Sequence, residues 1–210
     1  MFGFQRVGDL AWAAGDMQAR GFLLGGTAGR TTLAGEGLQH QDGHSHLLAS
    51  TIPNCVSYDP TYAYELAVII HHGMQRMFGD QENVFYYISV MNENYVQPAL
   101  PENVTDGIVK GMYLLHSDDD AKIQLLGSGA ILREVIAAAD LLKTEFGIVA
   151  NTWSVTSFNE LRREGLDCER WNMLHPNDSP RTSYVTSSLA EHVGPVVAAS
   201  DYMKIYADQI

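Results

Sequence analysis

The sequence is poor in cysteine, in basic residues and in long apolar runs. Its two cysteines, Cys55 and Cys168, lie far apart, so they mark neither a disulfide framework nor a metal knuckle. A reducing, cytoplasmic setting is therefore expected. The 13 Lys and Arg residues against 25 Asp and Glu give a net charge of -12, which argues against a nucleic-acid partner. No run reaches the ~18 apolar residues of a membrane-spanning helix, so no membrane partner is expected.

What is present is a globular composition, with 46% apolar and 18% charged residues over 210 positions. This length suits one large domain or parts of two. Residues 1–6 lack the apolar segment of a secretory signal. Near the other end, Tyr202, Ile205 and Tyr206 follow helical spacing, so the chain is expected to end inside or just after a helix. This ending suggests a truncated protein.

In the first half of the chain, apolar spacing and turn residues predict alternating helices and strands. Asp59 is expected to cap a helix that has Pro60 at its first position and ends at Gly79. In order, the expected elements are a helix over 7–20, a loop over 22–50, a strand over 52–58, that helix, a strand over 84–90 and a loop over 92–102.

The acidic run Asp118-Asp119-Asp120 predicts a linker, and we divide the chain into residues 1–116 and 117–210. After the linker, a strand, a tight turn, a helix and a second strand follow in order, which predicts a parallel α/β sheet. The expected elements are a strand over 122–126, a turn over 127–129, a helix over 131–146, a strand over 148–155, a helix over 158–164, a loop over 172–183 and a strand over 195–199.

The densest group of chemically active residues is the run of His40, Asp42, His44 and His46 on the first loop. Three interpretations compete. His-x-His beside a carboxylate could bind a metal, although no second ligand cluster occurs elsewhere in the sequence. The histidines could instead hold the loop by hydrogen bonds, which suits His44 and His46. A histidine could also act as a catalytic acid or base, because its proton exchanges near neutral pH.

Two glycine-rich segments invite phosphate-binding interpretations that their spacing does not support. The run from Gly25 to Gly29 is one residue too short for a phosphate loop, and Arg30 stands where that motif needs Lys. The turn 127–129 lacks the third glycine of a dinucleotide fingerprint, since Leu132 stands there. We interpret the first as an ordered loop and the second as a tight turn whose helix N-terminus could receive an anion.

Several segments together resemble one family, the homodimeric bacterial pyruvate dehydrogenase, the acetyl-transferring decarboxylating component. The most specific are Gly-Leu-Gln-His at 37–40 and Cys-Glu-Arg-Trp-Asn at 168–172. The others are 2–6, 25–27, 29–33, 35–40, 42–46, 52–55, 58–60, 92–95, 168–176 and 201–204. The likeness runs over the whole chain, with Gln41 where many members have Glu and Ala34 where many have Asn.

The resemblance implies an α/β fold made of two partial transketolase-like domains. Residues 1–116 would be the second half of the pyrimidine-binding domain, and residues 117–210 the first half of the C-terminal domain. Family members are much longer. Their diphosphate and magnesium ligands, the glutamate that activates the aminopyrimidine and a tyrosine that contacts substrate would precede Met1. The resemblance therefore implies that the isolated chain is inactive.

The resemblance also implies a reaction and two site residues. The family uses thiamine diphosphate and Mg²⁺ to decarboxylate pyruvate and to acetylate the lipoyl group of the dihydrolipoyl acetyltransferase. Phe2 matches the aromatic residue that packs on the aminopyrimidine ring, and His40 matches the active-site histidine near the thiazolium and the substrate. Arg6, His44 and His46 match positions to which we give supporting roles. We expect no metal ligand in this chain.

Two alternatives stay open on the sequence. Another transketolase-like thiamine diphosphate enzyme would share the fold, but the segments at 37–46 and 168–172 argue against it. A metal-binding module built on the histidine loop belongs to a different class, and a metal titration would separate it.

Overall fold

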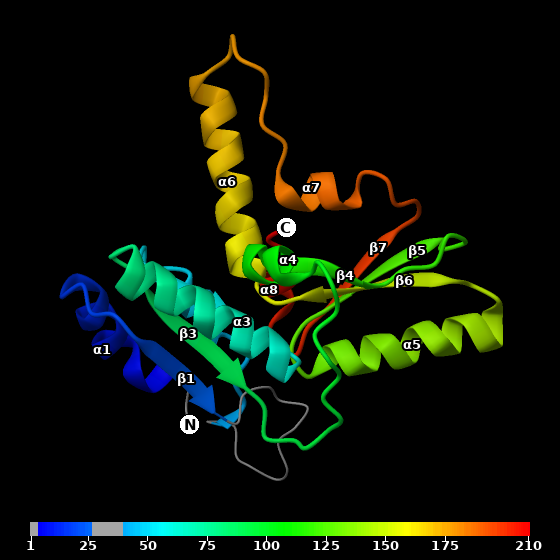
Figure 1. The fold of residues 1–210 in the computed structure, drawn as a ribbon, viewed down its shortest axis with the longest axis horizontal. Helices are drawn as coiled ribbons and strands as arrows, with labels where there is room; N and C mark the ends of the chain where they lie inside the picture. Colours follow the sequence, from blue (N-terminus) through cyan, green and yellow to red (C-terminus); the bar gives the residue numbers. More distant parts are fainter. Residues whose placement is uncertain (1–3, 27–39) are drawn as a thin grey trace.

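The structure, a computed structural model, describes residues 4–26 and 40–210 and contains two sheets (Figure 1). The first sheet is wholly parallel, in the order β1-β3-β2, and the second has the order β4-β6-β5-β7. The strands are β1 (Phe22–Gly26), β2 (Cys55–Tyr58), β3 (Phe85–Val90), β4 (Met112–His116), β5 (Ile123–Gly127), β6 (Ala150–Val155) and β7 (Val196–Ala199).

Helices cover both faces of the first sheet, as a buried parallel sheet requires. Side chains of β3 alternate: Phe85 and Tyr87 pack with α1 (Phe4–Asp16) and α2 (Ser45–Ala49), whereas Tyr86 and Ile88 pack with α3. Helix α3 spans Ala63–Met74 and continues as one π-helical turn, η2 (Gln75–Gly79). The core of the first sheet thus has two apolar layers, one on each face.

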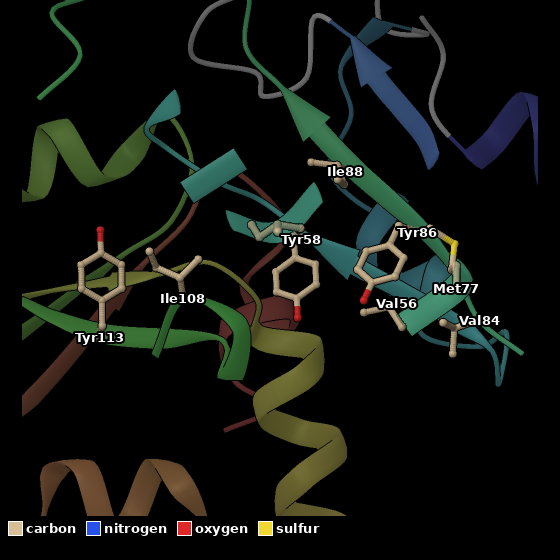
Figure 2. Close-up of a cluster of buried hydrophobic side chains, with 9 residues drawn as sticks. Val56, Tyr58, Met77, Val84, Tyr86, Ile88, Ile108 and Tyr113 are labelled. Carbon is tan, nitrogen blue, oxygen red and sulfur yellow. The ribbon is translucent and has the colours of Figure 1, made fainter. Parts of the chain in front are cut away.

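The layer beneath α3 continues into the second half of the chain (Figure 2). Tyr58 and Tyr86 stack with ring centroids 6.0 Å apart. Ile108 of α4 (Thr105–Lys110) and Tyr113 of β4 belong to the same buried cluster. The two sheets therefore meet across a shared apolar core, which we call the seam.

The second sheet also carries helices on both faces. Helix α5 (Ile131–Phe146) packs on β5 and β6, and its Leu132 and Val135 are buried. A second cluster joins Trp153 to α6 (Phe158–Leu174) and α8 (Lys204–Ala207). Figure 1 shows α6 extending away from both sheets before the chain returns through α7 (Tyr184–Leu189).

Most of the expected elements are confirmed, and the α/β fold class with them. Helix α5 has the predicted bounds, and β3, β5, β6 and β7 begin within about two residues of the predicted ones. Helix α1 begins and ends earlier than predicted, and α6 is longer. Strand β1 and helix α2 lie inside the segment predicted as one loop over 22–50, and α4 and β4 were not predicted.

Two expectations need correction. Strand β4 pairs antiparallel with β6, so the two sheets divide before Met112, and the acidic run 118–120 connects two strands of one sheet. Asp59 does not cap α3, because the helix begins after Tyr62. There the Glu65 carboxylate accepts hydrogen bonds from the backbone N–H groups of Thr61 and Tyr62.

Among residues 4–26 and 40–210, no helix combines the length and apolar character needed to cross a membrane.

Candidate active site

The two site residues predicted from the sequence differ in what the structure describes. His40 is half-buried at the start of the segment that leads into α2. Phe2 lies outside the described residues, as does most of the glycine-rich segment that follows β1. Of the supporting residues, Arg6 lies exposed on α1 and His44 is half-buried just before α2. The part of the site that can be described is therefore His40 and the residues that follow it.

The two residues after Gln41 form a tight turn that starts α2. The Asp42 carboxylate oxygen Oδ1 accepts hydrogen bonds from the backbone N–H groups of His44, at 3.2 Å, and Ser45, at 2.9 Å. Both Asp42 and Ser45 are buried. A short polar side chain that satisfies the first N–H groups of a helix fixes where the helix begins. The chain direction two residues after His40 is thus set by Asp42.

His46 lies inside the protein, at the carboxyl end of the first sheet. Its ring is stacked on Tyr206, with centroids 5.1 Å apart, and meets Tyr202 edge-on at 4.8 Å. Its Nε2 atom lies 3.0 Å from the Ser89 hydroxyl of β3. Burial lowers the pKa of His46 to about 4, against a smaller opposite effect of Asp42. His46 is therefore neutral at physiological pH, and its contacts are those of a structural residue packed in the core.

Ser89 connects His46 to a second buried acid, Asp59. The Ser89 hydroxyl donates a hydrogen bond to Asp59 Oδ1 at 2.5 Å, and this leaves its oxygen to accept from His46 Nε2. Burial raises the pKa of Asp59 to about 7, although hydroxyls of Ser89 and Ser128 oppose the rise. The result is a hydrogen-bonded row, His46–Ser89–Asp59, in which the serine stands in the middle. That order does not suit a nucleophilic serine, which needs the histidine as its base.

Asp59 also rests on the turn before α5. The backbone N–H of Gly129 donates to the Asp59 carbonyl at 3.1 Å, and the Thr61 hydroxyl donates to the Gly129 carbonyl at 2.7 Å. Gly129 has φ +51, and a Cβ there would overlap the Asp59 carboxylate. The turn at 127–129, expected as a tight strand-to-helix connection, is confirmed in that role. Through its hydrogen bonds to Asp59 and Thr61, this turn also connects the second sheet to the first.

A further carboxylate, that of Glu65, links the two sheets by hydrogen bonds. Glu65 of α3 is fully buried and accepts hydrogen bonds from the hydroxyls of Tyr113 and Ser154, each at 2.6 Å. These partners come from β4 and β6, and its other oxygen holds the start of α3. Burial raises the pKa of Glu65, while its hydrogen-bond donors act to lower it. Glu65 thus joins elements of both sheets.

The structure does not gather the loop histidines around a common point. His46 faces Ser89 and two tyrosines, and within the described part of the chain no three His, Cys, Asp or Glu side chains form a group that could hold a metal ion. The interpretation of His46 as a structural residue is supported by these contacts. The buried row and Glu65 were missed from the sequence, where Asp59 was read only as a helix cap.

The arrangement of two α/β sheets matches that of known transketolases. The structure superposes on a transketolase from Campylobacter jejuni with a TM-score of 0.69 over 95% of this chain and 27% of that one, at 16% identity. A Pichia stipitis transketolase gives 0.61 over 91% of this chain and 25% of that one, at 17% identity. At these identities the likeness shows the fold alone, so the fold is transketolase-like.

Sequence comparison is more specific. Residues 1–98 match the family described as pyruvate dehydrogenase E1 component middle domain, and residues 111–210 match the transketolase-like TK C-terminal domain. The whole chain is 67% identical to a pyruvate dehydrogenase E1 component of Pseudomonas aeruginosa and 60% identical to that of Escherichia coli K12, covering 24% of each. The chain belongs to the pyruvate dehydrogenase E1 family, and it spans about a quarter of the length of the curated relatives it matches.

Proposed function

We propose that the full-length protein containing this chain is the decarboxylating component of a pyruvate dehydrogenase complex. In that reaction pyruvate loses carbon dioxide, and its acetyl unit passes to the lipoyl disulfide of the dihydrolipoyl acetyltransferase, which is reduced and acetylated. Acetyl-CoA then forms in the complex. The observation that carries the proposal is the identity of 67% with a protein named for this component, in an alignment that covers the whole chain.

We infer that the cofactor is thiamine diphosphate with Mg²⁺. When bound, thiamine diphosphate supplies the carbanion and the electron sink for decarboxylation. The described residues fit one side of such a site, because the segment after His40 lies where β3 ends, and parallel sheets bind ligands at the carboxyl ends of their strands. As the family resemblance implies, residues outside this chain would hold the magnesium and the diphosphate.

In this proposal His40 is the catalytic residue. It is half-buried and stands two residues before Asp42, whose carboxylate anchors the start of α2. A histidine there can hold or deliver a proton at the carbonyl oxygen of the substrate as charge develops on it. Positioned acid–base catalysis contributes about 10²–10⁴-fold to the rate of such steps.

Phe2 has the role of a flat apolar wall against the aminopyrimidine ring of the cofactor, since aromatic faces stack well on such rings. Arg6 and His44 keep supporting roles. His46 supports the site from inside the protein, through Ser89. None of these three residues needs to touch the substrate for the proposal to hold.

The proposed partners follow from the reaction. The acetyltransferase and its lipoyl domain receive the acetyl unit, pyruvate is the substrate, and the enzyme acts as a cytoplasmic homodimer. The two partial domains would be the second half of the pyrimidine-binding domain and the first half of the C-terminal domain. We put the division between them before Met112, because β4 pairs with β6 of the second sheet.

An assay of the full-length enzyme tests the proposal. With thiamine diphosphate, Mg²⁺ and the lipoyl domain, pyruvate should give carbon dioxide and an acetylated lipoyl group. A ketose phosphate donor, the natural choice for a transketolase, should give no transfer. Turnover of the ketose phosphate with none of pyruvate would instead favour the transketolase alternative. The isolated 210-residue chain should be inactive under the same conditions.

A further inference from the structure

A cavity of about 170 Å³ lies at the carboxyl ends of β2 and β3. Its walls come from the start of α3, from the end of β3 and from segment 91–97, which follows β3. Ser89 lines the cavity, and the same serine is hydrogen-bonded to His46, in the segment that follows His40. The cavity therefore lies at the same edge of the sheet as the proposed active site, where parallel sheets bind their ligands.

Segment 91–97 is held in place by contacts with α5 and with the start of α3. The Tyr95 hydroxyl donates a hydrogen bond to the Thr61 carbonyl. The Gln97 side-chain oxygen accepts one from the backbone N–H of Ala63, at 2.8 Å. From α5, the Arg133 guanidinium lies over the Tyr95 ring, 4.5 Å from its centroid. The wall that this segment forms is therefore preorganised, which lowers the cost of binding a ligand.

The lining favours a neutral and largely apolar ligand. A charged residue of the lining, Glu93, is a carboxylate paired with Arg133 at 3.0 Å. A carboxylate at the wall repels an anionic ligand, since like charges placed together are costly. Most of the remaining wall consists of apolar side chains and aromatic rings, from Pro60, Tyr62, Leu66, Val90, Met91 and Tyr95.

We propose that this cavity binds the dithiolane ring of the lipoyl group when that group receives the acetyl unit. Pyruvate and thiamine diphosphate carry negative charge, whereas the lipoyl amide is neutral and mostly apolar. An apolar cavity of about 150 Å³ holds benzene, and the dithiolane ring is of comparable size. Its sulfur atoms would meet the rings of Tyr62 and Tyr95, and contacts between sulfur and aromatic rings are favourable. The inference rests on the proposed function, because it needs a lipoyl group as the acetyl acceptor.

Filling the cavity should exclude the ring while leaving decarboxylation intact. Ala63, the first residue of α3, lines the cavity and is exposed. In the full-length enzyme, Ala63→Phe should lower kcat/KM for the lipoyl domain about tenfold, the loss expected when a small apolar group is kept from a cavity. Ala67, one turn later on α3, is also exposed and does not line the cavity. Ala67→Phe is therefore the matched control and should stay near normal.

A second variant widens the cavity instead of filling it. Met91→Ala removes the thioether and part of the wall, so it should lower kcat/KM for the lipoyl domain by about threefold. Met74→Ala is the control, because Met74 is exposed on α3 away from the cavity. Melting temperatures of all four variants separate a loss of folded protein from a loss of turnover per folded enzyme.

Two further electron acceptors decide which ligand the cavity serves. With ferricyanide in place of the lipoyl domain, ferricyanide takes the electrons and water takes up the acetyl unit as acetate, so pyruvate still loses carbon dioxide. Ala63→Phe and Met91→Ala should then keep near-normal kcat and KM for pyruvate. With free lipoamide as the acceptor, both variants should show the same fractional loss as with the lipoyl domain.

Three results would overturn the inference. Equal losses with ferricyanide and with the lipoyl domain would assign the cavity to pyruvate or the cofactor. Normal use of the lipoyl domain by both Ala63→Phe and Met91→Ala would leave the cavity without this role. A loss with the lipoyl domain but none with free lipoamide would place the contact on the protein part of that domain. If the wild-type enzyme acetylates no lipoyl group, the proposed function fails instead.

Discussion

Asp59 and Glu65 are two buried carboxylates. In the sequence, one lies before the start of α3 and the other after it, and their hydrogen-bond partners differ. Glu65 accepts four hydrogen bonds, two from backbone N–H groups and two from hydroxyls. Asp59 is hydrogen-bonded by the hydroxyls of Ser89 and Ser128 and lies near the further carboxylates Asp42 and Asp201. For both acids, burial has the largest influence on the pKa and raises it.

The difference shows how the surroundings of a buried acid decide its use. The partners of Glu65 come from β4, from β6 and from the start of its own helix, so it acts as a connector between the sheets. Asp59 has fewer donors and more negative neighbours, and burial raises its pKa to about 7. Through Ser89 it also contacts His46, in the segment that follows His40. One carboxylate therefore stabilises the seam, and the other titrates beside the site.

The largest effect is expected from removing the connector. Glu65→Ala leaves the hydroxyls of Tyr113 and Ser154 and two backbone N–H groups without their acceptor, inside the protein. Because each unsatisfied buried group costs about 1–3 kcal/mol, we expect a loss of about 3–5 kcal/mol. Calorimetric melting of the full-length enzyme measures it. Glu134→Ala, at an exposed position of α5, is the control and should change stability by less than about 0.5 kcal/mol. Equal melting of the two variants would contradict the connector role.

The second prediction uses the opposite pKa changes of Asp59 and His46. Burial raises the pKa of Asp59 from 3.8 to about 7, so the folded state holds that proton more tightly, and stability falls as pH rises through this window. Burial lowers the pKa of His46 from 6.5 to about 4, so the unfolded chain takes up a proton first, and stability falls as pH drops through that window. Between about pH 4 and 6.5 the two slopes oppose each other.

Each single variant should therefore lose the slope of the group that it replaces. Relative to the wild type, the stability of Asp59→Asn should rise with pH from about 4 to 7, and that of His46→Gln should fall from about 4 to 6.5. Each slope approaches about 1.36 kcal/mol per pH unit near the middle of its window. Melting temperatures of the full-length variants between pH 4.5 and 7.5 provide the measurement. Parallel pH profiles for both variants and the wild type would refute the opposing slopes.

The third and smallest effect compares two glycines at the ends of α5. Gly129 and Gly147 have φ +51 and +65, so alanine is strained at both. A Cβ at Gly129 would also overlap the Asp59 carboxylate, whereas a Cβ at Gly147 would meet open space. Gly147→Ala should cost about 1 kcal/mol, and Gly129→Ala should cost about 1–3 kcal/mol more. Chemical denaturation of the two full-length variants measures the difference, and equal losses would exclude contact with Asp59.

The periodic elements of this fold could be predicted, and the exceptions have identifiable physical causes. Helix α5 has a clear apolar stripe, and its predicted bounds were right. Strand β1 ends in two glycines and therefore reads as a loop. Gly25 is required there because a side chain would overlap the Tyr87 hydroxyl. Tyr87 belongs to β3, which is far from Gly25 in the sequence but pairs with β1 in the sheet. Local pattern does not contain that information.

The candidate site divides in the same way. His40 and Phe2 came from the family resemblance, which depends on short motifs in order along the chain. The row His46–Ser89–Asp59 joins residues that lie 30 and 43 positions apart in the sequence. The pairing of β2 with β3 brings Asp59 to Ser89, and the packing of α2 on β3 brings His46 to Ser89. Asp59 followed by Pro60 is also a typical helix start. This local pattern led to the interpretation of Asp59 as a helix cap, so its burial was not predicted.

The proposed role of His40 is tested most directly by comparing His40→Ala with Phe2→Ala in the reconstituted complex. Overall turnover is measured as a function of thiamine diphosphate concentration. His40→Ala should lose about a hundredfold in kcat at saturating cofactor, which is about 2.7 kcal/mol at about 1.36 per decade, while its cofactor affinity changes little. Phe2→Ala should instead bind the cofactor more weakly. Near-normal turnover of His40→Ala, or full recovery of its turnover at saturating cofactor, would contradict the catalytic role of His40.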